Sequence, residues 1–185
     1  MPFEFKKTEI PEVVEVQPQV FTDERGTFAE LFKLDAFTEA GITEPLTQVN
    51  YSRSKKNVLR GMHYQLPPHA QSKLVSCSFG EVFDVAVDIR QGSPTFGMWV
   101  GRTLSGENKT MLYIPEGFAH GFFVVSDEAE VVYYCNNQYA PDAEGGLNWN
   151  DPAVGIVWPA QNPILADRDA AFPLLADAKN TFQYE

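Results

Sequence analysis

The chain has 185 residues, a length that fits one domain, and its 44% hydrophobic and 21% charged residues are typical of a globular protein. Its formal net charge is -11, so it lacks the basic surface that nonspecific binding to nucleic acid or to an anionic membrane requires. The sequence has no apolar leader and no apolar run of transmembrane length, which predicts a cytoplasmic protein. Cys77 and Cys135 lie in apolar runs and are expected to be buried thiols in that reducing compartment.

Short apolar segments dominate the sequence, many of them alternating with polar residues, and Gly, Pro, Asn and Asp interrupt them. This pattern is typical of β-strands. In chain order, strands are predicted near residues 12–20, 28–33, 58–65, 97–104, 111–115, 121–126 and 129–136. Residues 74–79 and 82–89 are interpreted as a tight hairpin. Its second strand would place on one face Phe83, Val85, Val87 and Ile89.

One helix is predicted, over residues 35–40, with Asp35 capping its start and Gly41 its end. The Pro- and Asp-rich segment from residue 150 onward is expected to wrap the surface with short helical turns. Closely spaced strands with so little helix predict an all-β fold, an antiparallel jelly-roll barrel with a cavity at its mouth. Residues 1–185 are expected to form a single domain.

Two segments resemble the sequence signature of cupin barrels. Residues 115–120 (PEGFAH) match its second half, in which a proline and a glycine shape a hairpin and a histidine points into the barrel. Residues 60–65 (RGMHYQ) correspond to the first half, but Gln65 stands where a metal-binding cupin has its second histidine. No glutamate follows closely. Because transition-metal sites usually need three or four imidazole, thiolate or carboxylate ligands, no metal and no other cofactor is expected.

Without a metal, the residues left for chemistry are His63, His120, Lys73 and tyrosines. A histidine is the usual general base near neutral pH, and a lysine ammonium can stabilise an enolate oxygen. A tyrosine hydroxyl can return a proton to the opposite face. Together these groups describe epimerisation beside a carbonyl group. Asp84 is interpreted as an inward residue that orients His120, with a solvated carboxylate as the alternative.

Strand alternation limits which side chains can share the cavity. Tyr133 and Tyr134 are neighbours, so only one of them faces the cavity in a regular strand, and alternation does not say which. Arg60 and His63 are an odd number of positions apart and would point to opposite faces. A β-bulge at Gly61 would bring both of them inward.

Several longer motifs strongly resemble the dTDP-4-dehydrorhamnose 3,5-epimerase family. They are residues 23–26 (DERG), 59–65 (LRGMHYQ), 70–75 (AQSKLV), 83–90 (FDVAVDIR), 93–97 (SPTFG), 114–122 (IPEGFAHGF) and 149–152 (WNDP). Their order is that of the family, and the resemblance extends over residues 5–176. It implies a metal-free, cupin-like jelly roll, usually a homodimer. It also implies epimerisation of dTDP-4-keto-6-deoxyglucose at C3 and C5 on the way to dTDP-L-rhamnose.

The same resemblance implies roles for individual residues. His63 matches the family's general base, and Asp169 matches the aspartate that supports it, with Asp167 as a rival. Tyr133 matches the catalytic acid, and Lys73 the lysine that holds the 4-keto oxygen. Matches to substrate-binding positions are Phe21, Arg25, Glu30, Gln48, Asn50, Arg60, His120, Tyr139 and Arg168. In the family, the arginines at two of these positions, Arg25 and Arg60, contact the diphosphate and the sugar.

Two departures from the family lie close to these positions. Val49 replaces a frequent aspartate near the cavity mouth, and Arg168 replaces a lysine. Relatives that act on C3 only share much of the motif set, so a C3-only epimerase of another deoxysugar pathway and a 4-keto/3-keto isomerase stay open. A sugar-nucleotide-binding cupin without activity and a metal-dependent cupin are the alternatives from other classes.

Overall fold

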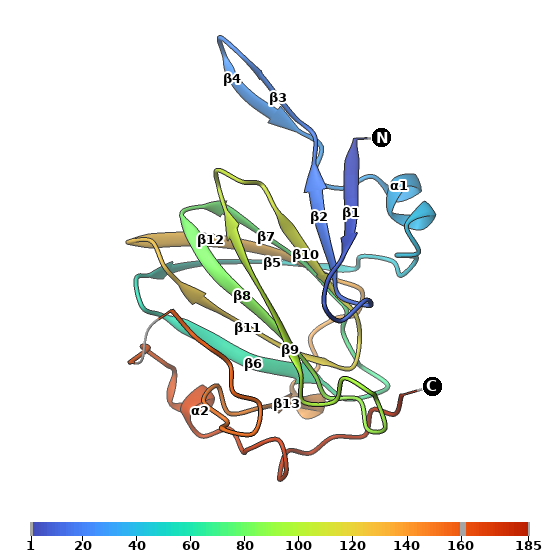
Figure 1. Ribbon diagram of the computed structural model, residues 1–185, viewed down its shortest axis with the longest axis vertical. Helices are drawn as coiled ribbons and strands as arrows, with labels where there is room; N and C mark the ends of the chain where they lie inside the picture. The colour runs from blue at the N-terminus through green and yellow to red at the C-terminus, as the bar shows by residue number, and fades with distance from the viewer. Residues whose placement is uncertain (1, 160–161, 185) are drawn as a thin grey trace.

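Two antiparallel sheets face each other in the computed structural model, which describes residues 2–159 and 162–184 (Figure 1). The larger sheet has the strand order β1 (Phe3–Lys7), β2 (Val14–Pro18), β10 (Met111–Ile114), β7 (Lys73–Phe79), β12 (Glu128–Cys135), β5 (Gln48–Lys55). The smaller sheet has the order β13 (Glu144–Gly146), β6 (Leu59–Gln65), β11 (Phe118–Val124), β8 (Glu81–Asp88), β9 (Trp99–Ser105). This architecture confirms the predicted all-β, antiparallel jelly roll.

A cluster of buried apolar side chains fills the space between the two sheets. It includes Val75 and Val131 from the six-stranded sheet and Val82, Val100 and Phe118 from the five-stranded sheet, none more than 3% exposed. Removing this apolar surface from water stabilises the fold by about 25 cal/mol per Å². The core therefore fixes the spacing of the sheets that carry the site.

The prediction that residues 74–79 and 82–89 form a hairpin is wrong. β7 pairs with β10 and β12 in one sheet, whereas β8 pairs with β9 and β11 in the other. Gly80, with φ +73°, lies between them and carries the chain across from sheet to sheet. Two apolar strands around a glycine give the same local signal for a hairpin and for this crossing.

The sequence pattern predicts most other strands to within a few residues, but it misses β1, β5, β13 and the strand over Val20–Asp23. The strand predicted over residues 28–33 meets only the end of the observed strand over Gly26–Ala29. β5 has polar residues on both faces, so its apolar alternation is weak. Helix α1 (Leu34–Glu39) is present, and Gly41 follows it with φ +88°. Asp35 is not its cap, because Lys33 occupies the N-cap position and Asp35 lies in the first turn. No helix among the described residues is long and apolar enough to span a membrane.

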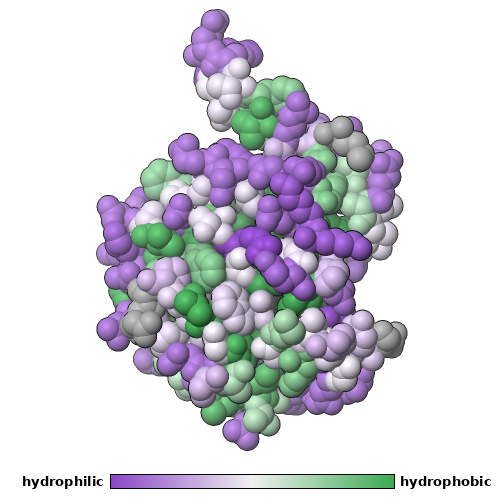
Figure 2. All heavy atoms as spheres, in the orientation of Figure 1, coloured by the Kyte–Doolittle hydropathy of each residue, from purple (hydrophilic) through white to green (hydrophobic). Residues whose placement is uncertain are grey.

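β3 (Val20–Asp23) and β4 (Gly26–Ala29) form a separate hairpin, here called the arm. The arm projects from the body of the protein, and its tip is hydrophilic (Figures 1 and 2). Phe21 and Phe28 on the arm are 50% and 66% exposed. An isolated hairpin is marginally stable in water. Large apolar side chains that are exposed on such a hairpin therefore favour a contact with another protein surface.

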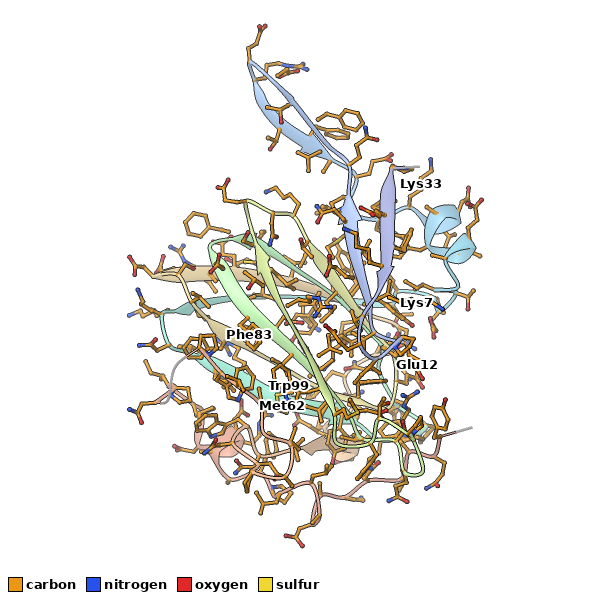
Figure 3. All side chains as sticks on the ribbon, in the orientation of Figure 1. Lys7, Glu12, Lys33, Met62, Phe83 and Trp99 are labelled. Carbon is orange, nitrogen blue, oxygen red and sulfur yellow. The ribbon has the colours of Figure 1, made fainter. Side chains whose placement is uncertain are left out.

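The segment after β13 runs across the outer face of the five-stranded sheet, so the prediction that residues from 150 onward wrap the surface is confirmed (Figure 1). It contains the short helix α2 (Asp167–Ala170) and follows the 3-10 turn Pro141–Ala143. The four residues predicted to share one face of β8 pack here: Phe83, Val85, Val87 and Ile89. In Figure 3 Phe83 lies near Trp99, and their ring centroids are 6.3 Å apart. The segment thereby holds α2 against β6.

Candidate active site

A cavity of about 640 Å³ lies between the two sheets. Strands β5, β6, β7, β11, β12 and β13 and helix α2 line it, together with residues from the segments after β12 and before α2. It brings together most residues proposed from the sequence: Gln48, Asn50, Arg60, His63, Lys73, His120, Tyr133, Tyr139, Arg168 and Asp169. The volume lies within the range of roughly 300–1,000 Å³ that small-molecule sites occupy.

His63 and Asp169 form a hydrogen-bonded pair in the cavity wall. Asp169 Oδ1 lies 2.9 Å from His63 Nε2, and Asp169 Oδ2 accepts the backbone N–H of Gly61 at 3.1 Å. Burial opposes ionisation of Asp169, but hydrogen bonds led by the one from His63 outweigh it and lower the pKa of that carboxyl. Helix α2 buries Asp169 and leaves Asp167 exposed, so Asp169 is the aspartate that meets the histidine.

An irregularity in β6 lets Arg60 and His63 line the same cavity. The pairing of β6 with β11 shifts by one residue between these two positions. Gly61 lies inside the shift with φ +136°, and a Cβ there would come within 2.5 Å of the Cα of Gly121. Only glycine suits such a position. The predicted bulge is confirmed, and both side chains face inward.

Lys73, at the start of β7, places a buried cation beside His63. Lys73 is only 8% exposed, and its ammonium lies 3.5 Å from the backbone oxygen of His63. Burial lowers the pKa of Lys73, while the charges of Asp84 and Glu144 oppose that shift. A fixed N–H donor in a site with little water suits the stabilisation of an oxyanion.

Of the two neighbouring tyrosines, Tyr133 lines the cavity, whereas Tyr134 packs against the apolar cluster under α1. Tyr133 projects from the six-stranded sheet and His63 from the five-stranded sheet, so they approach the cavity from facing walls. Burial raises the pKa of the Tyr133 hydroxyl, and the positive charge of Arg60 opposes this shift. The hydroxyl therefore carries its proton at neutral pH and can donate it.

His120 forms a second, more deeply buried pair with Asp84. Its Nε2 lies 2.8 Å from Asp84 Oδ1, and the two residues are 5% and 0% exposed. Burial lowers the pKa of His120, although the carboxylate of Asp84 opposes the shift. The interpretation that Asp84 faces inward and orients His120 is confirmed, and the alternative of a solvated carboxylate is wrong.

Arg60 differs from the other arginines in its surroundings. Five of the six arginines form ion pairs within the described residues: Arg25, Arg53, Arg90, Arg102 and Arg168. Arg60 has no ion pair in that part of the chain, and its Nε donates to Ser54 Oγ at 2.9 Å. Because the guanidinium stays charged at any ordinary pH, Arg60 leaves a positive charge available to an anion in the cavity.

Three proposed substrate-binding residues do not line this cavity. Phe21 and Arg25 lie on the arm, and Glu30 follows it directly. The Arg25 side chain is 85% exposed and pairs with Asp23. Because the arm points away from the body, these residues do not meet His63 within one copy of the chain (Figure 1).

Two residues, Glu144 and Val49, differ from what the sequence predicts. Glu144 Oε2 accepts hydrogen bonds from Arg168 Nη1 at 2.9 Å and from the Tyr139 hydroxyl at 3.1 Å. It begins a three-residue strand, which is too short to give a periodic signal. Val49 is 58% exposed on the outer face of β5, so the expectation that a polar group is missing at the cavity mouth is wrong.

The described residues hold no group of three or more His, Cys, Asp or Glu side chains arranged to bind a metal ion. Gln65, at the position of the second cupin histidine, has a structural role. Its Nε2 donates to the backbone oxygen of His69 at 2.6 Å, and its Oε1 accepts the N–H of Ala140 at 2.8 Å. Cys77 and Cys135 are free and buried, as predicted.

The fold and the cavity together define a cupin-like acid–base site, in which a supported histidine and a tyrosine face each other beside a buried lysine. The model of one family, dTDP-4-dehydrorhamnose 3,5-epimerase, matches residues 7–177. The chain belongs to this family. It is 58% identical to the Shigella flexneri enzyme of that name over 173 residues, covering 93% of this chain and 96% of the relative.

Solved structures agree with this assignment. One is the dTDP-6-deoxy-D-glucose-3,5-epimerase of Legionella pneumophila in complex with dTDP-4-keto-L-rhamnose. Its TM-score is 0.96 at 46% identity, and the match covers 99% of both chains. Another is a 3'-monoepimerase from Streptomyces bikiniensis in complex with dTDP-quinovose, with a TM-score of 0.86 at 38% identity, covering 91% of this chain and 86% of that one.

Proposed function

We propose that this chain epimerises dTDP-4-dehydro-6-deoxy-D-glucose at C3 and C5 to dTDP-4-dehydro-L-rhamnose, a step of dTDP-L-rhamnose biosynthesis. One observation carries the proposal. A histidine held by an aspartate projects from one sheet, and a protonated tyrosine projects from the facing sheet into the same cavity. Inverting a carbon requires a base on one face of the sugar and an acid on the other, which is the arrangement of His63 and Tyr133.

In this proposal His63 removes the proton beside the 4-keto group. Because Asp169 engages Nε2, Nδ1 is the ring nitrogen that takes the proton. Asp169 stabilises the imidazolium that results. The electrons move into the carbonyl to give an enolate, and the ammonium of Lys73 stabilises its oxygen. A single such donor contributes about 3–4 kcal/mol in comparable sites.

Tyr133 then donates its proton to the opposite face of the same carbon, which inverts it. The hydroxyl regains a proton and His63 loses one before the second carbon reacts. A tyrosine whose pKa is raised by burial is a weak acid. It donates only to a strong carbon base such as the enolate, and not to the substrate in its ground state.

We propose that Arg60 binds the diphosphate, since its charge is not neutralised by a carboxylate of the described chain. Other ligand contacts are assigned within the cavity to Gln48, Asn50, His120, Tyr139 and Arg168. Arg168 stands where a lysine is usual in the family, so the positive charge at this position is kept. We also propose that residues 1–185 form one cytoplasmic epimerase domain that uses no cofactor.

The arm supports a homodimer in which Phe21, Arg25 and Glu30 complete the cavity of the partner copy. They lie outside the cavity of their own chain, and the arm exposes phenylalanines that a second copy would cover. Mixing two inactive variants tests this idea. Arg25→Ala and His63→Ala homodimers should each be impaired, and exchange of subunits should restore one working site per mixed dimer. Failure of the mixture to regain activity would contradict a shared site.

Mass spectrometry tests the reaction. The protein is incubated with dTDP-4-dehydro-6-deoxy-D-glucose in deuterated buffer containing a chelator, and the sugar nucleotide is returned to light water. Uptake of two deuterons on carbon supports the proposal. Uptake of one would favour the C3-only alternative, which similarity to the Streptomyces monoepimerase keeps open. No uptake of deuterium would favour a binding protein without activity. Uptake that occurs without the chelator but not with it would favour a metal-dependent cupin.

A further inference from the structure

Strand β5 turns a row of polar side chains toward the cavity. Gln48, Asn50 and Ser52 line it, whereas Val49, on the other face of the strand, is 58% exposed. The next inward residue, Ser54, is 5% exposed and does not line the cavity itself. Its hydroxyl oxygen accepts the Nε–H of Arg60 at 2.9 Å. The serine therefore lies behind the arginine, on the side away from a ligand.

The guanidinium group is planar, and its five N–H donors form a fixed fork. When Nε is engaged by Ser54, the plane of the group is fixed, and the terminal Nη1 and Nη2 donors remain for a ligand. The position of Ser54 is itself well defined, because it pairs with Ala129 in the ladder between β5 and β12. Ser54 thus determines which edge of Arg60 faces the cavity.

A neutral partner has an effect that a carboxylate would not have. Arg168 binds Glu144 and Arg25 binds Asp23, so an incoming anion competes with a carboxylate for both of these cations. A serine hydroxyl orients the guanidinium and leaves its full charge for the ligand. In a chain of net charge -11, this arrangement keeps one cation ready for an anion.

We propose that Ser54 is a positioning residue that directs the terminal donors of Arg60 at the diphosphate of the bound nucleotide sugar. The proposal rests on the proposed function, specifically on the role of Arg60 as the diphosphate ligand. Ser54 acts through Arg60 and touches no ligand atom. Its loss should raise KM and the dissociation constant of dTDP, and kcat should stay near that of the wild type, since the reacting carbons lie at His63 and Tyr133.

The test is a double-mutant cycle on dTDP affinity, measured by calorimetry with Ser54→Ala, Arg60→Ala and the double variant. Ser54→Ala should weaken binding about tenfold or more, because one hydrogen bond to a charged group contributes about 1.5–3 kcal/mol. Arg60→Ala should weaken it more, and the double variant should match Arg60→Ala. Ser54→Thr, which keeps the hydroxyl, should restore affinity. Ser54→Cys fills the same space with a weak acceptor and should behave like Ser54→Ala.

Ser78→Ala is the matched control. Its hydroxyl donates to the backbone oxygen of Glu130 at 3.2 Å in the same sheet but outside the cavity, so dTDP affinity should not change. Unchanged affinity in Ser54→Ala and Ser54→Cys, with weakened binding in Arg60→Ala, would overturn the role of Ser54 alone. Additive losses in the double variant would overturn it too. Unchanged affinity in Arg60→Ala would overturn the diphosphate assignment of Arg60 itself.

Discussion

Replacing Asp169 with asparagine tests the contact that supports the proposed base. The side chain keeps its size, and an amide oxygen can still accept the Gly61 N–H that now lies 3.1 Å from Oδ2. The change removes the negative charge 2.9 Å from His63 Nε2. When His63 takes a proton, that hydrogen bond joins two charged groups and contributes about 1.5–3 kcal/mol. Asp169→Asn should therefore lower kcat by about 10- to 150-fold.

The rate of deuterium uptake from solvent at saturating substrate measures this loss. KM should change little, because Asp169 acts on the histidine. Asp167→Asn is the matched control, since Asp167 lies on the same helix with its side chain exposed. Its kcat should equal that of the wild type. A kcat for Asp169→Asn close to that of the wild type would refute the reasoning, and so would an equal loss in Asp167→Asn.

The same variant has a signature in stability against pH. The pKa of Asp169 is lowered in the folded protein, so its contribution to stability is fully present above the unfolded value of about 3.9. The contribution is lost as pH falls through the lowered pKa. Asp169→Asn should therefore lower the melting temperature at pH 7, and the difference from the wild type should shrink in strong acid. A difference independent of pH would contradict the shift.

Three other variants test the rest of the site. Lys73→Met should abolish epimerisation yet raise the melting temperature at pH 7, because a buried ammonium with a lowered pKa destabilises the folded chain. The gain in melting temperature should shrink as the pH rises toward about 10.4, the pKa of lysine in the unfolded chain. Tyr133→Phe should retain carbon–deuterium exchange without inversion, whereas Tyr134→Phe should match the wild type, as proton NMR of the products would show. Gly61→Ala should lower the melting temperature by more than Gly41→Ala, because its Cβ would lie 2.5 Å from a backbone atom of β11 while position 41 is open. Equal melting temperatures for the two alanine variants would contradict the close approach.

The sequence predicts most strands and the bulge in β6 because those signals are local. Alternation along β8 places Phe83 and Val85 on one face, and the glycine at position 61 marks the bulge that brings Arg60 and His63 together. Tyr133 required the family resemblance, since alternation alone left Tyr134 as a rival. The resemblance left Asp167 as a rival of Asp169, and only the burial of Asp169 by helix α2 separates the two.

The features that the sequence does not predict depend on long-range contacts. The crossing at Gly80 and a hairpin at Gly80 have the same local pattern, and only strand partners far along the chain distinguish them. β5 lacks apolar alternation because its inner face lines a polar cavity, and that same feature concealed Ser54. The arm residues lie outside the cavity because the hairpin projects away from the sheets, and sequence periodicity does not encode the direction in which a hairpin projects.

Proton NMR in deuterated buffer shows whether His63 removes the protons at C3 and C5. The C3 and C5 proton signals of dTDP-4-dehydro-6-deoxy-D-glucose are followed over time with the wild type and with His63→Ala. We expect that the wild type erases both signals in the presence of a chelator and that His63→Ala erases neither. Exchange at the wild-type rate at either carbon in His63→Ala would contradict this expectation.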